Sequence, residues 1–184
     1  NNARNHMSVS TVVTAFSTTL NGSGEIVAIA DTGIDQDHGD MNNRIVAAVS
    51  VVSGDSSTED LHSGHGTHVS CTVLGDGSRG GYAGVAPEAQ LYFQAMQRDS
   101  DGAFYSPSMN YLLNAAYNNG ARTHTNSWGS QQNYGEYTTD SEDVDDRTNT
   151  CDQYWSYDGL TVLFSAGNDG NGVGTVTPPA TAKN

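Results

Sequence analysis

Three histidines recur at every third position in the most constrained part of this sequence. They are His62, His65 and His68, and two glycines bracket the central one in Gly64-His65-Gly66-Thr67-His68-Val69. Glycine beside a reactive side chain lets backbone or substrate approach where a Cβ would block it. Thr67 predicts the N-cap of a helix that continues beyond it. His65 would then stand at the N-terminal end of that helix, in a position suited to a general base.

The same spacing also suits metal binding, because zinc ligands on one helical face recur in this way. That interpretation requires a continuous helix from His62 that includes both Gly64 and Gly66. Each glycine costs a helix about 1 kcal/mol relative to alanine. A metal-dependent hydrolase that uses His62, His65 and His68 therefore remains an alternative, and general-base chemistry is the preferred hypothesis.

Short apolar runs that end at turn residues alternate with helical patterns along the chain. A run of this kind is typical of a strand buried on both faces, and strands alternating with helices indicate an α/β fold. We therefore predict a mainly parallel twisted sheet with helices on both faces. The predicted strands are residues 25–30, 45–52, 91–96, 121–126 and 160–166. The predicted helices are residues 7–20, the segment from Thr67, residues 109–119, which follow a cap at Ser106-Pro107, and residues 144–157.

Polar side chains directly follow three of these predicted strands. They are Asp31, the segment Ser127-Trp128-Gly129, and Asn168. Functional groups of open parallel sheets gather beyond the carboxyl ends of the strands, so these residues should meet at one edge, together with His65. A buried carboxylate can orient an imidazole that takes a proton from a nucleophile, and an amide side chain can donate to a developing oxyanion.

Length and charge narrow the classes of function. The 184 residues fit one domain, and the formal net charge of −14 disfavours binding to nucleic acid or to an anionic membrane. The longest apolar runs are far shorter than the roughly 20 residues of a membrane span. The first residue is Asn1, which favours a secreted protein whose preceding segment was removed. The cysteines, Cys71 and Cys151, are too few for a disulfide framework.

Five segments, in this order, resemble the subtilisin-like serine proteases, or subtilases. They are Ile29-Ala30-Asp31-Thr32-Gly33-Ile34-Asp35, Gly64-His65-Gly66-Thr67-His68-Val69, Gly84-Val85-Ala86-Pro87, Asn126-Ser127-Trp128-Gly129 and Ser165-Ala166-Gly167-Asn168-Asp169-Gly170. The resemblance covers nearly the whole chain, and residues 126–129 and 181–184 are most similar to an alkaline bacterial branch of the family. It implies the subtilisin-like version of the predicted fold, and a secreted endopeptidase that hydrolyses polypeptides through an Asp-His-Ser triad and an acyl-enzyme.

The resemblance also implies a role for each matching residue. Asp31 would orient the imidazole of the general base His65, and Asn168 would donate to the oxyanion. The substrate would pair with an extended segment on either side. One is Ser127, Trp128 and Gly129, and the other contains Gly102 and Ala103.

One element of the family pattern is missing from these residues. Subtilases carry their nucleophile in a Gly-Thr-Ser-Met-Ala motif on a later helix, and residues 1–184 contain no such motif. We therefore expect residues 1–184 to be the N-terminal part of a single catalytic domain, incomplete in this chain. The preferred explanation is a nicked enzyme whose C-terminal fragment carries the serine. The alternatives are a truncated chain and a catalytically silent scaffold.

The resemblance implies no cofactor for catalysis, but it does imply structural Ca²⁺. The acidic run at Asp140, Glu142, Asp143, Asp145 and Asp146 is more typical of a solvated face than of a calcium site, so no ligands are assigned. No metal ligand is predicted elsewhere. A further departure is Cys71, which replaces a glycine of the family pattern and adds volume to the helix that carries His65.

Overall fold

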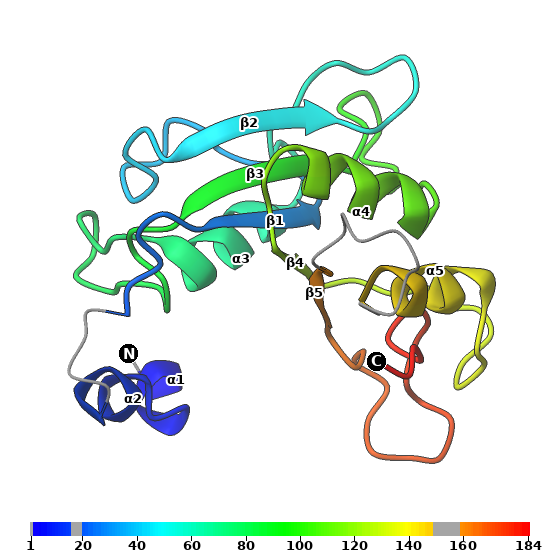
Figure 1. The fold of residues 1–184 in the computed structure, drawn as a ribbon. Helices are drawn as coiled ribbons and strands as arrows, with labels where there is room; N and C mark the ends of the chain where they lie inside the picture. Colours follow the sequence, from blue (N-terminus) through cyan, green and yellow to red (C-terminus); the bar gives the residue numbers. More distant parts are fainter. Residues whose placement is uncertain (1, 16–19, 149–158) are drawn as a thin grey trace.

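A five-stranded sheet organises the protein, which is described here by a computed structural model (Figure 1). The structure describes residues 2–15, 20–148 and 159–184. The strands are β1 (Ile26–Asp31), β2 (Ile45–Ser50), β3 (Gln90–Ala95), β4 (Thr123–Asn126) and β5 (Thr161–Phe164). The helices are α1 (Asn2–His6), α2 (Val9–Ala15), α3 (His65–Leu74), α4 (Met109–Asn118) and α5 (Thr139–Thr148).

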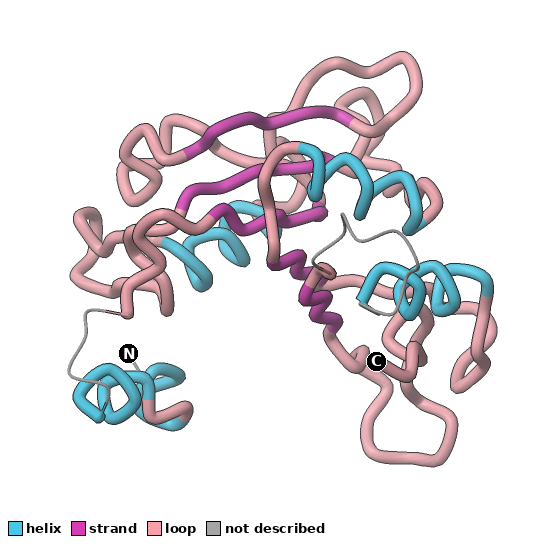
Figure 2. Tube along the Cα trace, viewed as in Figure 1, coloured by secondary structure: helices cyan, strands magenta, loops and turns pink. Residues whose placement is uncertain are grey.

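The strands lie in the order β2-β3-β1-β4-β5, and every neighbouring pair is parallel. β1 is the central strand, so its carboxyl end lies between those of β3 and β4. Beyond β5 the described chain forms only loops (Figure 2). The predicted α/β fold with a mainly parallel sheet is confirmed.

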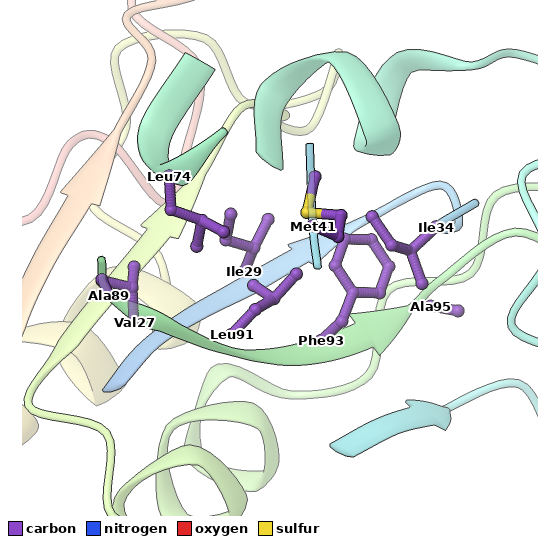
Figure 3. Packing of buried hydrophobic residues seen from close by; sticks show 9 residues of the cluster. All are labelled: Val27, Ile29, Ile34, Met41, Leu74, Ala89, Leu91, Phe93 and Ala95. Atoms are coloured by element: carbon purple, nitrogen blue, oxygen red, sulfur yellow. The ribbon is translucent and has the colours of Figure 1, made fainter. Parts of the chain in front are cut away.

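Alternate residues of β1 pack on opposite faces of the sheet. Val27 and Ile29 join a buried cluster with Leu74 of α3, and Figure 3 shows Leu74 beside Ile29. Ala30 lies in a second cluster with residues of α4 and α5, among them Leu112. Side chains of a strand alternate between its two faces, so each face of β1 is covered by helices.

The boundaries of several predicted elements were wrong by a few residues. α3 begins at His65, and Gly64 instead of Thr67 occupies the N-cap position. α4 is capped by Ser108, whose side chain accepts from the amide of Tyr111, so the prediction of a cap at Ser106-Pro107 was wrong. α5 begins five residues before the predicted start at Val144. The rest of that predicted helix, from residue 149, lies outside the described residues, as do residues 16–19 of the first predicted helix.

No helix among residues 2–15, 20–148 and 159–184 is both long enough and apolar enough to cross a membrane.

His124 of β4 lies at the centre of a buried polar chain that connects β4 and β3 with α4. Its Nε2 is 2.9 Å from Oε1 of Gln94, and its Nδ1 is 3.0 Å from Nδ2 of Asn126. The Gln94 amide in turn donates to the carbonyl of Leu112. Both ring nitrogens are therefore bonded to neutral groups, and burial lowers the pKa of His124 to about 3. His124 is therefore a core histidine whose hydrogen-bonding groups are satisfied.

Acid should destabilise the protein through His124. An unfolded histidine binds a proton below about pH 6.5, whereas the buried ring resists protonation down to about pH 3, so unfolding takes up a proton in that window. The free energy of unfolding should therefore fall by about 2 kcal/mol between neutral pH and pH 5 from this group alone. Urea titrations at several pH values should show a shallower pH slope in His124→Gln. The exposed His6→Gln variant should keep the wild-type slope, and equal slopes in all three proteins would contradict the assignment.

Candidate active site

Asp31 is the last residue of β1 and is almost completely buried, with 1 % of its side chain exposed. Its Oδ1 accepts a hydrogen bond of 2.7 Å from the amide of Thr32. Its Oδ2 is buried and has no hydrogen-bond partner in the described part of the chain. Burial raises the pKa of Asp31, while the hydrogen bonds to Oδ1, first that from His65, oppose the rise.

His65 is the first residue of α3, and a carboxylate from the preceding loop fixes this end of the helix. Asp60 Oδ1 accepts from the amide of Gly64, and its Oδ2 accepts from both the amide and the hydroxyl of Thr67. A carboxylate at a helix N-terminus satisfies free amides and interacts favourably with the helix dipole. Asp60 therefore performs the capping role that the sequence analysis assigned to Thr67.

The structure joins Asp31 and His65 directly. Oδ1 of Asp31 lies 2.6 Å from Nδ1 of His65. Because a carboxylate accepts, Nδ1 carries the proton, and Nε2 of the neutral ring is left as the acceptor. The imidazole is 46 % exposed, so this acceptor is available to an incoming group. The arrangement is one in which an acid orients a base.

Gly66 allows the pair to form, because α3 crosses the chain after β1 at this residue. A Cβ on Gly66 would lie 2.2 Å from the carbonyl oxygen of Gly33 and 2.9 Å from Cζ of Phe93. Its amide donates to the hydroxyl of Thr32, next to Asp31. The absence of a side chain thus sets the distance between β1 and α3.

Gly66→Ala should destabilise the protein by about 3 kcal/mol, because backbone and a buried ring must both move to admit a methyl group. Denaturant unfolding monitored by circular dichroism measures the loss. Gly80→Ala is the matched control, since its Cβ would meet only an atom of Tyr82 at 3.5 Å. A wild-type free energy of unfolding in Gly66→Ala would show that the close approach is not needed.

The two predicted substrate-binding segments meet through aromatic contacts. Trp128 donates from Nε1 to the carbonyl of Ala30 in β1, which ties the loop after β4 to the central strand. Its ring lies 6.0 Å from that of Phe104, which directly follows Ala103, and 5.7 Å from that of Phe164.

Beside these rings lies a cavity of about 460 Å³ lined by Phe104, Trp128, Gly129 and the Pro178-Pro179 segment, among others. Ser127, Gly102 and Ala103 do not line it. The substrate-binding roles of Gly102, Ala103, Ser127, Trp128 and Gly129 stay predictions.

Asn168 lies on the loop that follows β5, and it is exposed. No hydrogen bond joins it to Asp31 or His65, both of which are described. Its place after the carboxyl end of β5 is the one expected from the sequence, and its role as an oxyanion donor stays a prediction.

The alternative metal site is not assembled. His62 bonds through Nε2 to the carbonyl of Asp99 at 2.7 Å, while His65 bonds to Asp31. Among the described residues, one group of three potential ligands converges, and it consists of His38, Asp40 and Cys71. The histidines of the sequence hypothesis do not belong to it.

The acidic run on α5 bonds largely to backbone amides. Asp140 and Asp143 accept from the amides of Met109 and Asn110 at the start of α4. Asp145 accepts from the amides of Lys183 and Asn184 and from the hydroxyl of Tyr137. These carboxylates are structural, and among the described residues no three side chains of this run converge as metal ligands.

Two residues of the site were missed by the sequence analysis. Thr32 links the acid to the base, because its amide donates to Asp31 and its hydroxyl accepts from Gly66. The Thr32 hydroxyl donates in turn to Asp60. Thr32 could have been suspected from its place directly after Asp31, whereas Asp60 lies in a polar loop with no local pattern that distinguishes it.

Comparison with known proteins agrees with this geometry. The model of the subtilase family (Peptidase S8) matches residues 22–184. Subtilisin Savinase of Lederbergia lenta is 35 % identical over 161 residues, which are 88 % of this chain and 53 % of that protein. The serine protease/ABC transporter B family protein tagD of Dictyostelium discoideum is 33 % identical over 187 residues, which are 90 % of this chain and 10 % of that protein.

A solved structure shows the same fold. The psychrophilic subtilisin-like protease from an Antarctic Pseudoalteromonas aligns with a TM-score of 0.64 and 24 % identity, over 86 % of this chain and 34 % of that one. This chain spans about half the length of Savinase and only about a tenth of the tagD protein.

Proposed function

Because this chain belongs to the subtilase family, we propose that residues 1–184 supply the acid and the base of a serine endopeptidase whose nucleophilic serine lies on a segment outside these residues. The observation that carries the proposal is the contact of 2.6 Å between Asp31 Oδ1 and His65 Nδ1. A buried carboxylate on one ring nitrogen and an accessible second nitrogen form the acid-base part of a triad.

The chemistry follows from the protonation of the ring. Nε2 of His65 takes the proton of the serine hydroxyl as its oxygen attacks the peptide carbonyl, and the imidazolium is stabilised by Asp31. The same Nε2 then gives its proton to the leaving amine, and an acyl-enzyme remains. In the second half, a water transfers its proton to His65 and attacks the acyl group. His65 then returns this proton to the serine oxygen as the acyl–oxygen bond breaks, which releases the carboxylic acid and regenerates the serine.

The substrate is a polypeptide that lies in extended form between two segments. Ser127, Trp128 and Gly129 form one side, and Gly102 and Ala103 form the other. The aromatic rings of Phe104 and Trp128 beside the cavity favour a large apolar side chain at this place.

Asn168→Ala should lower kcat by about 10²–10³-fold with little change in KM, because the lost donor acts on the oxyanion of the transition state. Steady-state hydrolysis of a chromogenic peptide by the intact protein measures both constants. Asn171→Ala, three residues further along the same exposed loop, should behave as wild type. A loss confined to KM, or an equal loss in both variants, would contradict the role of Asn168.

Serine-directed chemistry is tested with an organophosphonate probe on the intact protein that contains this chain. The probe should abolish hydrolysis and label one serine outside residues 1–184, whereas brief chelation should leave the activity unchanged. The intact mass of the labelled species shows whether that serine lies on the same polypeptide or on a separate C-terminal fragment. Resistance to the probe with loss under chelation would select the metal-dependent alternative. A folded protein without turnover would be a silent scaffold.

Two further properties belong to the proposal. The protein is secreted, and its recovery from the medium instead of the cell would support this. A cellular location would contradict it and would match the major intracellular serine protease of Bacillus subtilis, a relative that is 43 % identical over 75 residues. Structural Ca²⁺ braces its loops at sites that we do not assign, and an unchanged melting temperature in chelator would refute this.

A further inference from the structure

A second cluster of reactive side chains lies apart from the Asp31–His65 pair. His38 and Asp40 lie in the turn that follows β1, and Cys71 lies on α3. One ligand atom from each of the three falls within 4.8 Å of the others. All three line a cavity of about 590 Å³. Cys71 is more than thirty positions away from His38 and Asp40 in the sequence, so the fold brings it to them.

The distances suit a tetrahedral ion. Sγ of Cys71 lies 3.7 Å from Nδ1 of His38. Zinc bonds of about 2.3 Å to sulfur and about 2.05 Å to nitrogen, at a tetrahedral angle, place these two atoms about 3.6 Å apart. The separation of Sγ and Nδ1 therefore has the length that such an ion requires. The amide of Asp40 lies 3.3 Å from the same Nδ1, and the ion would replace this weak contact.

Asp40 supplies the third ligand from a fixed position. The residue is 8 % exposed, and its Oδ1 accepts from the amide of Arg79 at 2.6 Å and from the hydroxyl of Ser78. No donor in the described part of the chain bonds to its Oδ2, so this carboxylate oxygen is left available to a ligand. Ligating carboxylates that are themselves hydrogen-bonded are typical of metal sites.

The donor set selects the kind of cation. Sulfur, imidazole nitrogen and one carboxylate oxygen suit a borderline-soft ion, whereas Ca²⁺ prefers six to eight oxygens. The three residues also contribute two negative charges once the thiol is ionised, which balances a divalent ion. We propose that His38, Asp40 and Cys71 form a binding site for Zn²⁺ or a similar divalent transition-metal ion, with water in the fourth position.

Binding replaces the thiol proton of Cys71, which leaves to solvent, and forms bonds to Sγ, to Nδ1 of His38 and to Oδ2 of Asp40. The ion would connect the turn after β1, which follows Asp31, with the helix that begins at His65. This role is separate from the peptidase chemistry, and it does not depend on it.

The test is a titration of the intact protein with Co²⁺, which reports a thiolate ligand through a sulfur-to-metal absorption band. We expect the band to saturate at one equivalent and Zn²⁺ to displace it. Cys71→Ser should abolish the band, and Cys151→Ser, the matched variant at the other cysteine, should keep it. Absence of the band, or its survival in Cys71→Ser, would overturn the proposal.

Two more variants test the same site if Cys71→Ser does not fold, which its circular dichroism spectrum would reveal. His38→Gln and Asp40→Asn retain the thiol and should each weaken Co²⁺ binding by about 100-fold. His65→Ala should leave the cobalt spectrum unchanged, which separates this site from the alternative that uses His62, His65 and His68. Wild-type affinity in both His38→Gln and Asp40→Asn would refute the assigned ligands.

Discussion

His65→Ala will lower kcat for peptide hydrolysis by the intact protein by about 10⁶-fold, a magnitude taken from subtilisin-type triads in general. The reason lies in the 2.6 Å contact, since the nitrogen opposite Asp31 is the only ring acceptor that can take the serine proton. KM should change little, because the ring acts on the transition state more than on the bound peptide. Steady-state kinetics with a chromogenic peptide measures both.

His68→Ala is the matched control, because His68 lies three residues further along α3 and is exposed. It should retain wild-type kcat. Under the metal-dependent alternative, both variants would lose activity to a similar extent. That result, or a His65→Ala enzyme with near wild-type kcat, would refute the role of His65 as the base.

Asp31→Asn should lower kcat by about 10⁴-fold and leave the fold intact. Oδ1 of Asp31 accepts from both His65 and the amide of Thr32. If the new NH₂ group took that place, it would face the Thr32 amide and force the proton of His65 onto Nε2. If it took the place of Oδ2, the ring would keep its tautomer, but no charge would stabilise the imidazolium. Both orientations therefore weaken the base.

Asp35→Asn is the matched control, because Asp35 lies four residues further along the chain and is exposed. This control should be fully active. A loss in Asp31→Asn of tenfold or less, with an unchanged circular dichroism spectrum, would contradict the orienting role of Asp31.

Most of the strands could be predicted because they are short apolar runs that end at turn residues, whereas β4 consists of the polar residues Thr-His-Thr-Asn. The predicted strand at residues 25–30 corresponds closely to β1. The parallel topology alone predicted the edge of the sheet at which the site lies. The same run predicted Asp31 at the carboxyl end of the strand, and the structure has it as the last residue of β1. The family resemblance added the residue roles, which neither spacing nor composition supplies.

The details that the sequence did not predict depend on contacts between distant segments. The cap of α3 comes from Asp60 in a polar loop, so the local pattern at Thr67 was misleading. In the sequence, Asp140 and Asp143 are typical of a solvated helix face, but in the fold their carboxylates accept hydrogen bonds from the start of α4. The approach of His38 to Cys71 likewise follows from the packing of α3 against the turn after β1.

A double-mutant cycle in kcat on Asp31→Asn and His65→Ala tests most directly whether the two side chains act as one unit. Residues that work through one another lose activity non-additively. If Asp31 acts only by orienting and charging the His65 ring, the double variant should be no slower than His65→Ala alone. If the two losses multiply, Asp31 and His65 act independently, and the hydrogen bond between them is not the basis of the activity.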